Sequence, residues 1–279
     1  MEIKNAIAAG ALALAALVAS PSLAKDVVIG TEGAYAPWNL TNPDGTLDGF
    51  EIELMKNVCG RAQLTCTFVT HDWDTIIESL NANKFDVILD GLSITPDRAK
   101  VIAFSIPYAS TPVGFATLKD SPLVNLPGTG TDITLTGADT DKAQIDKFRD
   151  QFKGKTIGVQ TATIYTKFLD DNFGSIATIK EYKTVDERDA DLVAGRIDAT
   201  FDDETALAAS LTGKGHEDMV LTAPAIAGPI WGPGIGLGLR QADTGLKTAF
   251  DKAIQAAITD GTVKTLSEKW FKLDVTPKQ

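Results

Sequence analysis

Beyond residue 25, short β-rich segments alternate with segments whose apolar residues recur at helical spacing. Residues 26–30 (DVVIG) are typical of a buried strand, and apolar residues at positions 50, 54, 55, 58 and 62 predict a helix over 49–63. The pattern continues with a strand over 65–70, a helix over 73–83 and a strand over 84–92. Such alternation predicts an α/β fold with mostly parallel sheets that carry helices on both faces.

The second half of the chain repeats this alternation. Strands are predicted over 155–160, 177–182 and 196–203, with helices over 163–173, 185–195 and 204–211. Residues 119–154 interrupt the pattern with an irregular stretch, and a helix is predicted over 139–152. A glycine-rich, strand-like run at 228–240 precedes two further helices, which we expect to divide at Gly261.

Two segments of the chain are similar to each other. Residues 80–91 (LNANKFDVILDG) align with 192–203 (LVAGRIDATFDD), which pairs Asp86 with Asp198 and Asp90 with Asp202. Each segment contains a helix end, a turn with a basic residue and a strand that ends in an acid. Common connections between helices and strands explain this by convergence; alternatively, the chain holds two similar α/β lobes, each with polar groups at strand carboxyl ends, where open α/β sheets bind ligands.

In the two-lobe interpretation, one lobe comprises residues 25–110 and 233–279, and the other comprises residues 111–232. We expect the chain to cross between the lobes near 109–117 and again near 228–236.

Residues 1–24 have the layout of a cleaved secretory signal. Lys4 lies in a short polar start, an apolar run follows from Ala6 to Ala19, and Ser22-Leu23-Ala24 ends the segment. A membrane anchor is the alternative, but this run is shorter than the ~20 residues that a spanning helix needs. We therefore expect export, with cleavage before Lys25.

Cys59 and Cys66 are the only cysteines. In an exported protein, a disulfide between them is the leading interpretation. A metal pair is the alternative, but two cysteines with His71 fall short of a structural zinc set, so we expect no metal.

The net charge of −11 argues against nucleic acid and anionic membrane surfaces as partners. With only His71 and His216, the chain has no convincing Ser-His-Asp set and no HExxH motif. These absences weaken a hydrolase interpretation, although catalysis by carboxylates stays open.

Opposite charges follow the predicted strand ends of the two lobes. Arg98 lies just after one strand, in a turn with Ser93 and Thr95, and its fork suits a carboxylate. The acids at 202–204 end a strand of the other lobe, where one of them suits an ammonium group. A zwitterion would bridge the two, unless Arg98 is a surface cation paired with Asp97 and residues 202–204 are a solvated first helical turn.

The chain resembles the periplasmic solute-binding proteins of polar amino-acid ABC importers over nearly its whole mature length. Motifs such as LSITPDRAKVIAFS carry the resemblance, which extends over residues 29–39, 48–59 with Cys66, 92–105, 153–163, 192–204, 234–240 and 260–271. It implies a monomeric, two-lobed type II binding protein in the periplasm of a Gram-negative bacterium. Such a protein has no cofactor and delivers its ligand to an inner-membrane permease.

The resemblance also implies roles for individual residues. Arg98 would take the α-carboxylate of the ligand, helped by Ser93 and the region of Thr163, and Asp203 would take the α-ammonium. Tyr35 and Trp73 would sandwich the stem of the ligand between aromatic rings. Glu32 would bind a distal cationic group. Gln160 and Tyr165 would line the wall of the second lobe.

Three residues depart from the family pattern. Asp90 and Gly91 stand where relatives that bind basic amino acids often have serines, so a further acid is expected in the pocket. Ile164 stands where a hydroxyl is common, so the second lobe is expected to contact the carboxylate through its backbone.

The segment 119–154 and the C-terminal TPKQ are closer to the branch that binds arginine and opines. The expected function is therefore transport of a cationic amino acid or opine, namely arginine, ornithine, lysine, octopine or nopaline. A cyclohexadienyl dehydratase acting on arogenate or prephenate is the enzymatic alternative on the same fold, and a receptor that serves a chemosensor is a third possibility.

Overall fold

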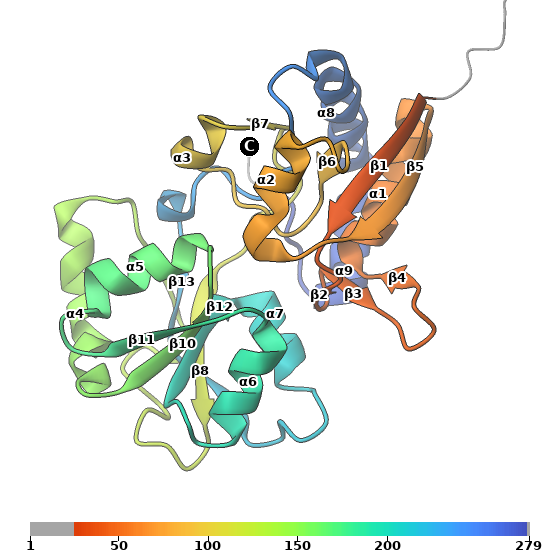
Figure 1. Ribbon diagram of the computed structural model, residues 1–279. Helices are drawn as coiled ribbons and strands as arrows, with labels where there is room; N and C mark the ends of the chain where they lie inside the picture. The colour runs from red at the N-terminus through yellow and green to blue at the C-terminus, as the bar shows by residue number, and fades with distance from the viewer. Residues whose placement is uncertain (1–24, 278–279) are drawn as a thin grey trace, which may run out of the picture.

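Two separate mixed sheets, one in each of two lobes, form the framework of the molecule (Figure 1). The computed structural model describes residues 25–277, and the predicted signal peptide, residues 1–24, lies outside the described residues. The predicted two-lobed α/β architecture, with helices on both faces of each sheet, is confirmed.

The first lobe has a five-stranded sheet with the order β5-β1-β6-β14-β7. Its parallel part comprises β1, β5 and β6, whereas β14 runs antiparallel to both of its neighbours. The strands are β1 (Lys25–Thr31), β5 (Leu64–Thr70), β6 (Val87–Ile88), β7 (Ala103–Phe104) and β14 (Gly238–Leu239). A small antiparallel sheet lies beside it, made of β2 (Ala34–Tyr35), β3 (Asn39–Thr41) and β4 (Leu47–Asp48).

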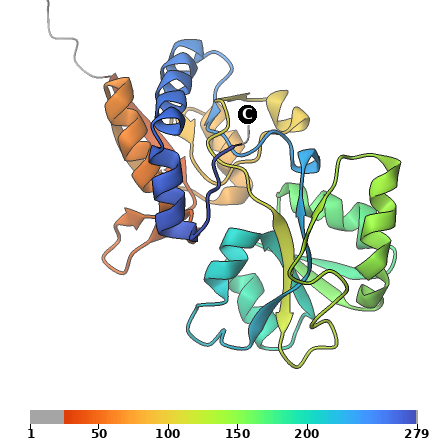
Figure 2. The ribbon, with the colours of Figure 1, turned by 180° about the vertical axis from the view of Figure 1, so that it is seen from behind.

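Alternate residues of β1 face two different cores, as the strand period of two requires. Val27 and Ile29 join the core under α1 (Phe50–Ala62), α8 (Thr244–Thr259) and α9 (Thr262–Phe271), which lie side by side in Figure 2. Val28 packs on the opposite side with α2 (Ile76–Asn81) and the 3₁₀ turn η1 (Trp73–Thr75). The predicted division of the last two helices at Gly261 is confirmed, since this residue has φ 80°.

The second lobe has a six-stranded sheet with the order β11-β10-β12-β8-β13-β9. Its strands are β8 (Val113–Leu118), β9 (Asp132–Thr134), β10 (Thr156–Gln160), β11 (Thr178–Tyr182), β12 (Ala199–Asp203) and β13 (Met219–Ala227). One face packs on α4 (Lys142–Arg149) and α5 (Ile164–Phe173) through phenylalanines 115, 148, 152, 173 and 201. The other face packs on α6 (Val185–Val193) and α7 (Glu204–Ser210).

The similarity between residues 80–91 and 192–203 corresponds to the same corner in both lobes. Asp86 exchanges two hydrogen bonds with Val28: its carboxylate accepts from the backbone N–H at 3.0 Å, and its own N–H donates to the carbonyl at 2.7 Å. Asp198 does the same with Thr156, at 2.8 and 2.9 Å. Each aspartate therefore ties the start of its strand to the neighbouring parallel strand.

Some predicted boundaries were wrong because sheet pairing, rather than local propensity, sets strand length. The strand predicted over 84–92 pairs only at Val87–Ile88. The crossing expected near 109–117 overlaps the second sheet, since Val113–Leu118 form β8. The run at 228–240 contains the 3₁₀ turn η4 (Pro229–Trp231) before β14 begins. By contrast, the bounds of the helix predicted over 139–152 are confirmed, although its two ends are the 3₁₀ turns η2 (Asp139–Asp141) and η3 (Asp150–Phe152) on either side of α4.

We propose that the lobes divide between residues 110 and 111 and between residues 232 and 233. No strand of either main sheet spans these points in the described part of the chain. Around them, Ile235 forms isolated bridges with Ser93 and Ala109, so the two crossing segments run against each other. We call these segments, residues 105–112 and 228–237, the hinge.

Cys59 and Cys66 form a disulfide that links the end of α1 to the start of β5, with 6.2 Å between their Cα atoms. The alternative of a metal pair is therefore wrong.

Replacing both cysteines by alanine should lower the free energy of unfolding by about 2–3 kcal/mol, because the short closed loop no longer restricts the unfolded chain. Urea denaturation of the oxidised wild type and the double variant measures the difference. Ligand affinity should stay unchanged, since the bond lies at the start of β5, away from the strand carboxyl ends. An unchanged urea midpoint would contradict the prediction.

Candidate functional site

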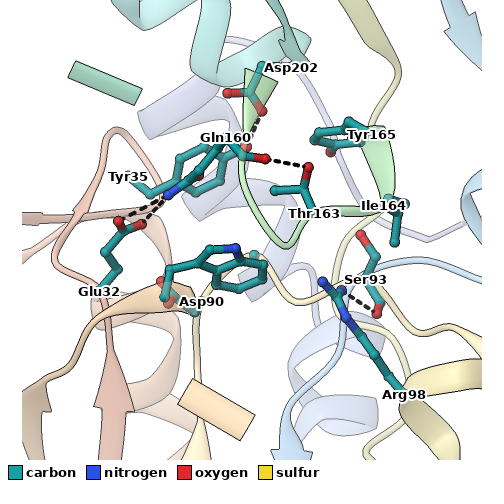
Figure 3. Close-up of a pocket in the computed structure, with 12 residues that line it drawn as sticks. Glu32, Tyr35, Asp90, Ser93, Arg98, Gln160, Thr163, Ile164, Tyr165 and Asp202 are labelled. Carbon is teal, nitrogen blue, oxygen red and sulfur yellow. Dashed lines mark hydrogen bonds between the residues drawn. The ribbon is translucent and has the colours of Figure 1, made fainter. Parts of the chain in front are cut away.

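A cleft of about 360 Å³ lies between the two lobes (Figure 3). Its lining residues are Glu32, Tyr35, Trp73, Asp90, Gly91, Ser93, Arg98, Gln160, Thr163, Ile164, Tyr165 and Asp202. The structure thus brings together every residue predicted for the site except Asp203, whose neighbour Asp202 lines the cleft instead.

The cleft is built from the carboxyl ends of strands in both lobes, as in other open α/β sheets. In the first lobe, Glu32 follows β1, and residues 90–93 follow β6. In the second lobe, Gln160 ends β10, and Asp202 lies near the end of β12. The repeated corner described above therefore places polar side chains of both lobes at one place.

Direct hydrogen bonds join the two lobes across the cleft. The Nε2 atom of Gln160 donates to both carboxylate oxygens of Glu32, at 3.0 and 3.1 Å. The Tyr35 hydroxyl donates to Asp202 Oδ1 at 2.9 Å. These bonds hold the lobes together around the cleft.

Arg98 also contacts both lobes from one end of the cleft. It lies in α3 (Pro96–Ala99), where the Thr95 hydroxyl caps the helix as predicted by accepting from the Arg98 N–H at 3.2 Å. Its guanidinium donates to the Ser93 carbonyl at 3.1 Å and to the Ala162 carbonyl of the other lobe at 3.2 Å. The Trp73 ring lies 5.3 Å from the guanidinium carbon. Burial lowers the pKa of Arg98 to about 10, so it stays charged at neutral pH.

The opposite end of the cleft carries two acids without a cationic partner among the described residues. Burial raises the pKa of Glu32 to about 7, although the bond from Gln160 opposes the shift. Asp90 Oδ1 accepts from Asn39 at 2.9 Å, whereas its buried Oδ2 atom has no hydrogen-bond partner. Burial and the nearby Glu32 and Glu51 raise the pKa of Asp90 well above its usual range.

Glu51 forms hydrogen bonds with residues at the acidic end of the cleft, and the sequence analysis did not identify it. It is fully buried in α1 and accepts from the Gly91 N–H at 2.8 Å, from Asn39 at 2.9 Å and from the Tyr108 hydroxyl. The sequence did contain a signal for this buried residue, namely an acid among the apolar core positions of the predicted helix. Gly91 has φ 55°, and a Cβ atom there would lie 3.0 Å from the Tyr35 ring, so glycine suits this position.

Asp202 and Asp203 have different surroundings despite being adjacent. Asp202 pairs with Arg188, a fully buried residue of α6 that also binds Asp189 at 2.9 Å. Asp203 caps α7 by accepting from the Thr205 N–H at 2.8 Å, and it also accepts from the Thr111 hydroxyl. Burial raises the pKa of Asp203 to about 6. Sequence reasoning missed Arg188 because a charged residue in a helix is normally exposed.

The start of α5 forms part of the cleft wall. Thr163 is its N-cap but makes no capping bond, because its hydroxyl donates to the Gln160 carbonyl at 2.9 Å. The first N–H groups of α5 therefore remain without a side-chain acceptor beside Ile164 and Tyr165, which line the cleft. Uncapped N–H groups and the helix dipole favour an anionic group here.

Within residues 25–277, no three or more histidine, cysteine or acidic side chains are placed to hold a metal ion. In the same range, no helix has the length and apolar character needed to cross a membrane.

Comparison with known proteins matches residues 27–273 to the family described as bacterial extracellular solute-binding proteins, family 3. The octopine-binding periplasmic protein of Rhizobium meliloti is 42% identical over 296 residues, covering 99% of this chain and 100% of the relative. The histidine-binding periplasmic protein of Salmonella typhimurium is 34% identical over 263 residues, covering 93% of each.

Among solved structures, a periplasmic His/Glu/Gln/Arg/opine family-binding protein from Silicibacter pomeroyi, in complex with lysine, superposes with a TM-score of 0.72. It is 33% identical and covers 90% of this chain and 100% of its own.

Replacing Arg188 by methionine should lower the free energy of unfolding by about 3–5 kcal/mol, because Asp202 would be left buried without its cation. Urea denaturation measures the loss. The matched control is Arg196→Met, whose ion pair with Asp191 is exposed on the arginine side and should change stability by less than about 0.5 kcal/mol. Equal effects of the two substitutions would contradict the prediction.

Proposed function

Since this chain belongs to family 3 of the bacterial extracellular solute-binding proteins, we propose that it captures a cationic amino acid or an arginine-derived opine between its lobes. The proposed ligands are arginine, ornithine, lysine, octopine and nopaline. The observation that carries the proposal is the polarity of the cleft, which has Arg98 at one end and the unpaired acids Glu32 and Asp90 at the other (Figure 3).

The carboxylate of the ligand would bind between Arg98 and the start of α5. The guanidinium can offer a carboxylate further donors in a fixed plane. The uncapped N–H groups beside Ile164 complete the contact from the second lobe through the backbone, with Ser93 and Thr163 on either side. A ligand bound this way touches both lobes and stabilises the closed form.

The α-ammonium would pair with Asp203, which adjoins the cleft residue Asp202 but does not itself line the cleft. This carboxylate has hydroxyl and N–H partners but no cation among the described residues, whereas Asp202 is already neutralised by Arg188. A buried carboxylate without a counter-charge gains from a ligand cation.

The cationic side chain would meet Glu32 and Asp90. Its aliphatic part would lie between the rings of Tyr35 and Trp73, both largely buried in the cleft, while Gln160 keeps Glu32 oriented. Two buried acids disfavour a neutral side chain, because it would leave them desolvated without a partner.

Family membership agrees with the prediction of a periplasmic binding protein rather than an enzyme. We propose that the protein acts as a monomer and presents its closed form to an inner-membrane ABC permease, with nucleic acid disfavoured by the net charge of −11. The dehydratase alternative requires turnover of prephenate, and a prephenate assay tests it directly.

Calorimetry with arginine, ornithine and lysine should give heats of binding, and glutamine should give none or far weaker binding. Arg98→Ala should weaken arginine binding by at least about 30-fold, since losing a buried charged contact costs about 2–5 kcal/mol. Arg98→Lys should also weaken it because the planar fork is lost. The control Arg61→Ala removes a surface arginine paired with Asp260 and should bind normally. Wild-type affinity in Arg98→Ala would overturn the carboxylate assignment.

Arginine affinity should depend on pH near neutrality. Because burial raises the pKa of Glu32 to about 7, the free carboxyl is half protonated there and must lose its proton to pair with a cation. The dissociation constant should therefore rise about fivefold from pH 7 to pH 6, or about tenfold from pH 8 to pH 6, and change little above pH 8. Calorimetry at these pH values measures it.

Glu32→Gln is the matched control for this pH dependence. It should bind arginine more weakly and lose most of the change between pH 6 and 8, whereas Asp90→Asn reports any share of the second acid. Equal wild-type affinity at pH 6 and pH 8 would contradict the assignment.

A further inference from the structure

Trp38 is a fully buried residue of the first lobe that makes a hydrogen bond to the second lobe. Its indole Nε1 donates at 2.8 Å to the hydroxyl of Thr205, which lies at the start of α7. The indole ring packs edge-to-face on Phe50, with 5.5 Å between the ring centroids, and lies 4.8 Å from the ring of Phe271. These contacts fix the direction in which the indole N–H points.

The bond between Trp38 and Thr205 crosses an apolar contact between the lobes. Val185 at the start of α6 and Ala206 in α7 belong to the second lobe, yet both pack with the hydrophobic core of the first lobe. Thr205 itself is 3% exposed. Little water therefore competes for this bond while the lobes are together, whereas separation of the lobes breaks it.

The hydroxyl of Thr205 also contacts Asp203, the proposed partner of the ligand's α-ammonium. It donates to Asp203 Oδ1 at 2.5 Å, and the Thr205 N–H donates to the same atom at 2.8 Å. A hydroxyl has one proton to donate and two lone pairs with which to accept, so it serves Trp38 and Asp203 together. Trp38, Thr205 and Asp203 thus form a directed chain of hydrogen bonds from the first lobe to the carboxylate, which we call the relay.

The contacts of Asp203 leave room for one further donor. Oδ1 accepts twice from Thr205, and Oδ2 accepts from the hydroxyl of Thr111 in the hinge. Because a carboxylate offers about four acceptor sites, one site on Oδ2 stays open within the hydrogen bonds described for residues 25–277. Thr205 therefore holds the carboxylate in an orientation that reserves Oδ2 for an ammonium.

Negative charge on Asp203 strengthens the relay. A hydroxyl that donates to an ionised carboxylate is polarised, and its oxygen becomes a better acceptor for the next donor in the chain. Burial raises the pKa of Asp203 to about 6, and a ligand ammonium favours the ionised form by giving the buried charge a partner. The polarised Thr205 hydroxyl then accepts more strongly from Trp38, which is possible only with the lobes together.

We propose that Thr205 and Trp38 are positioning residues that couple the α-ammonium of the ligand to closure of the lobes. This inference rests on the proposed function, which assigns the ammonium to Asp203, and it adds two residues outside the lining of the cleft. The ammonium thus favours the closed form through the relay in addition to the direct contacts that the ligand makes in the cleft.

Calorimetry with arginine and with 5-guanidinopentanoate, which is arginine without its α-ammonium, tests the coupling. Thr205→Val keeps the shape of the side chain but neither donates nor accepts, so it should weaken arginine binding at least tenfold and 5-guanidinopentanoate binding less than threefold. Thr205→Ser restores the hydroxyl and should bind arginine within threefold of wild type. The matched control is Thr212→Val, at an exposed threonine just beyond α7 whose hydroxyl donates to the Ala209 carbonyl, and it should bind both ligands normally.

Trp38→Phe tests the other end of the relay, because it removes the indole N–H. It should weaken arginine binding at least fivefold. The double variant with Thr205→Val should bind arginine within twofold of Thr205→Val alone, since the two residues act through one bond. NMR of the indole N–H, assigned by its loss in Trp38→Phe, provides a direct signature: the resonance should move downfield when arginine binds to the wild type but not when it binds to Thr205→Val.

The outcomes separate this inference from the proposed function. If arginine, ornithine and lysine all fail to bind the wild type, the proposed function fails and the relay with it. If arginine binds Thr205→Val as tightly as wild type, or if this variant weakens both ligands by the same factor, the positioning role fails while the proposed function stands. Losses that multiply in the double variant would also overturn the relay.

Two further measurements decide the matter if the first comparison fails for a technical reason. Should Thr205→Val fold poorly by urea denaturation, or should 5-guanidinopentanoate give no heat even with the wild type, the decision passes to Trp38→Phe and Thr205→Ser. A loss of arginine affinity in Trp38→Phe together with near-normal binding by Thr205→Ser would support the relay. Wild-type arginine affinity in Trp38→Phe would overturn it.

Discussion

A charged side chain can leave water only if partners replace its hydration, and this constraint organises the space between the lobes. Arg188 is fully buried, yet Asp202 and Asp189 balance it within the second lobe. Glu32, Asp90 and Asp203 have no such cation among the described residues, and burial raises their pKa values. The ion pairs of Arg188 stabilise the second lobe itself. The three acids without a cation could instead pair with a cation supplied by a ligand.

The repeated corner explains how both lobes meet this constraint with the same backbone. Asp86 and Asp198 tie equivalent strands to their neighbours, and four residues later Asp90 and Asp202 are buried at equivalent strand ends. The two lobes differ in whether the buried aspartate at this strand end has a cationic partner. Arg188 neutralises Asp202, while Asp90 keeps a buried oxygen atom without a partner.

Most elements were predictable because helical and strand periodicity follows directly from burial on one face. The short pairing of β6 and the start of β8 were not, since sheet partners come from distant segments. Eleven of the predicted site residues line the cleft, because the recognised motifs include the strand ends from which the cleft is built. The choice between Asp202 and Asp203 was not predictable, because it depends on the directions in which two adjacent side chains point. Glu51 escaped notice because a charged helical residue is usually exposed.

The bonds across the cleft bear on how closure is driven. Gln160 and Glu32, Tyr35 and Asp202, and Arg98 and the Ala162 carbonyl already join the lobes through groups that also line the cleft. Each contact of this kind contributes only a modest net free energy, because the same groups make hydrogen bonds to water when the lobes are apart. A ligand shifts the equilibrium only through interactions that it makes more strongly in the closed form. The acids that remain unmatched are therefore the groups through which a cationic ligand can favour closure.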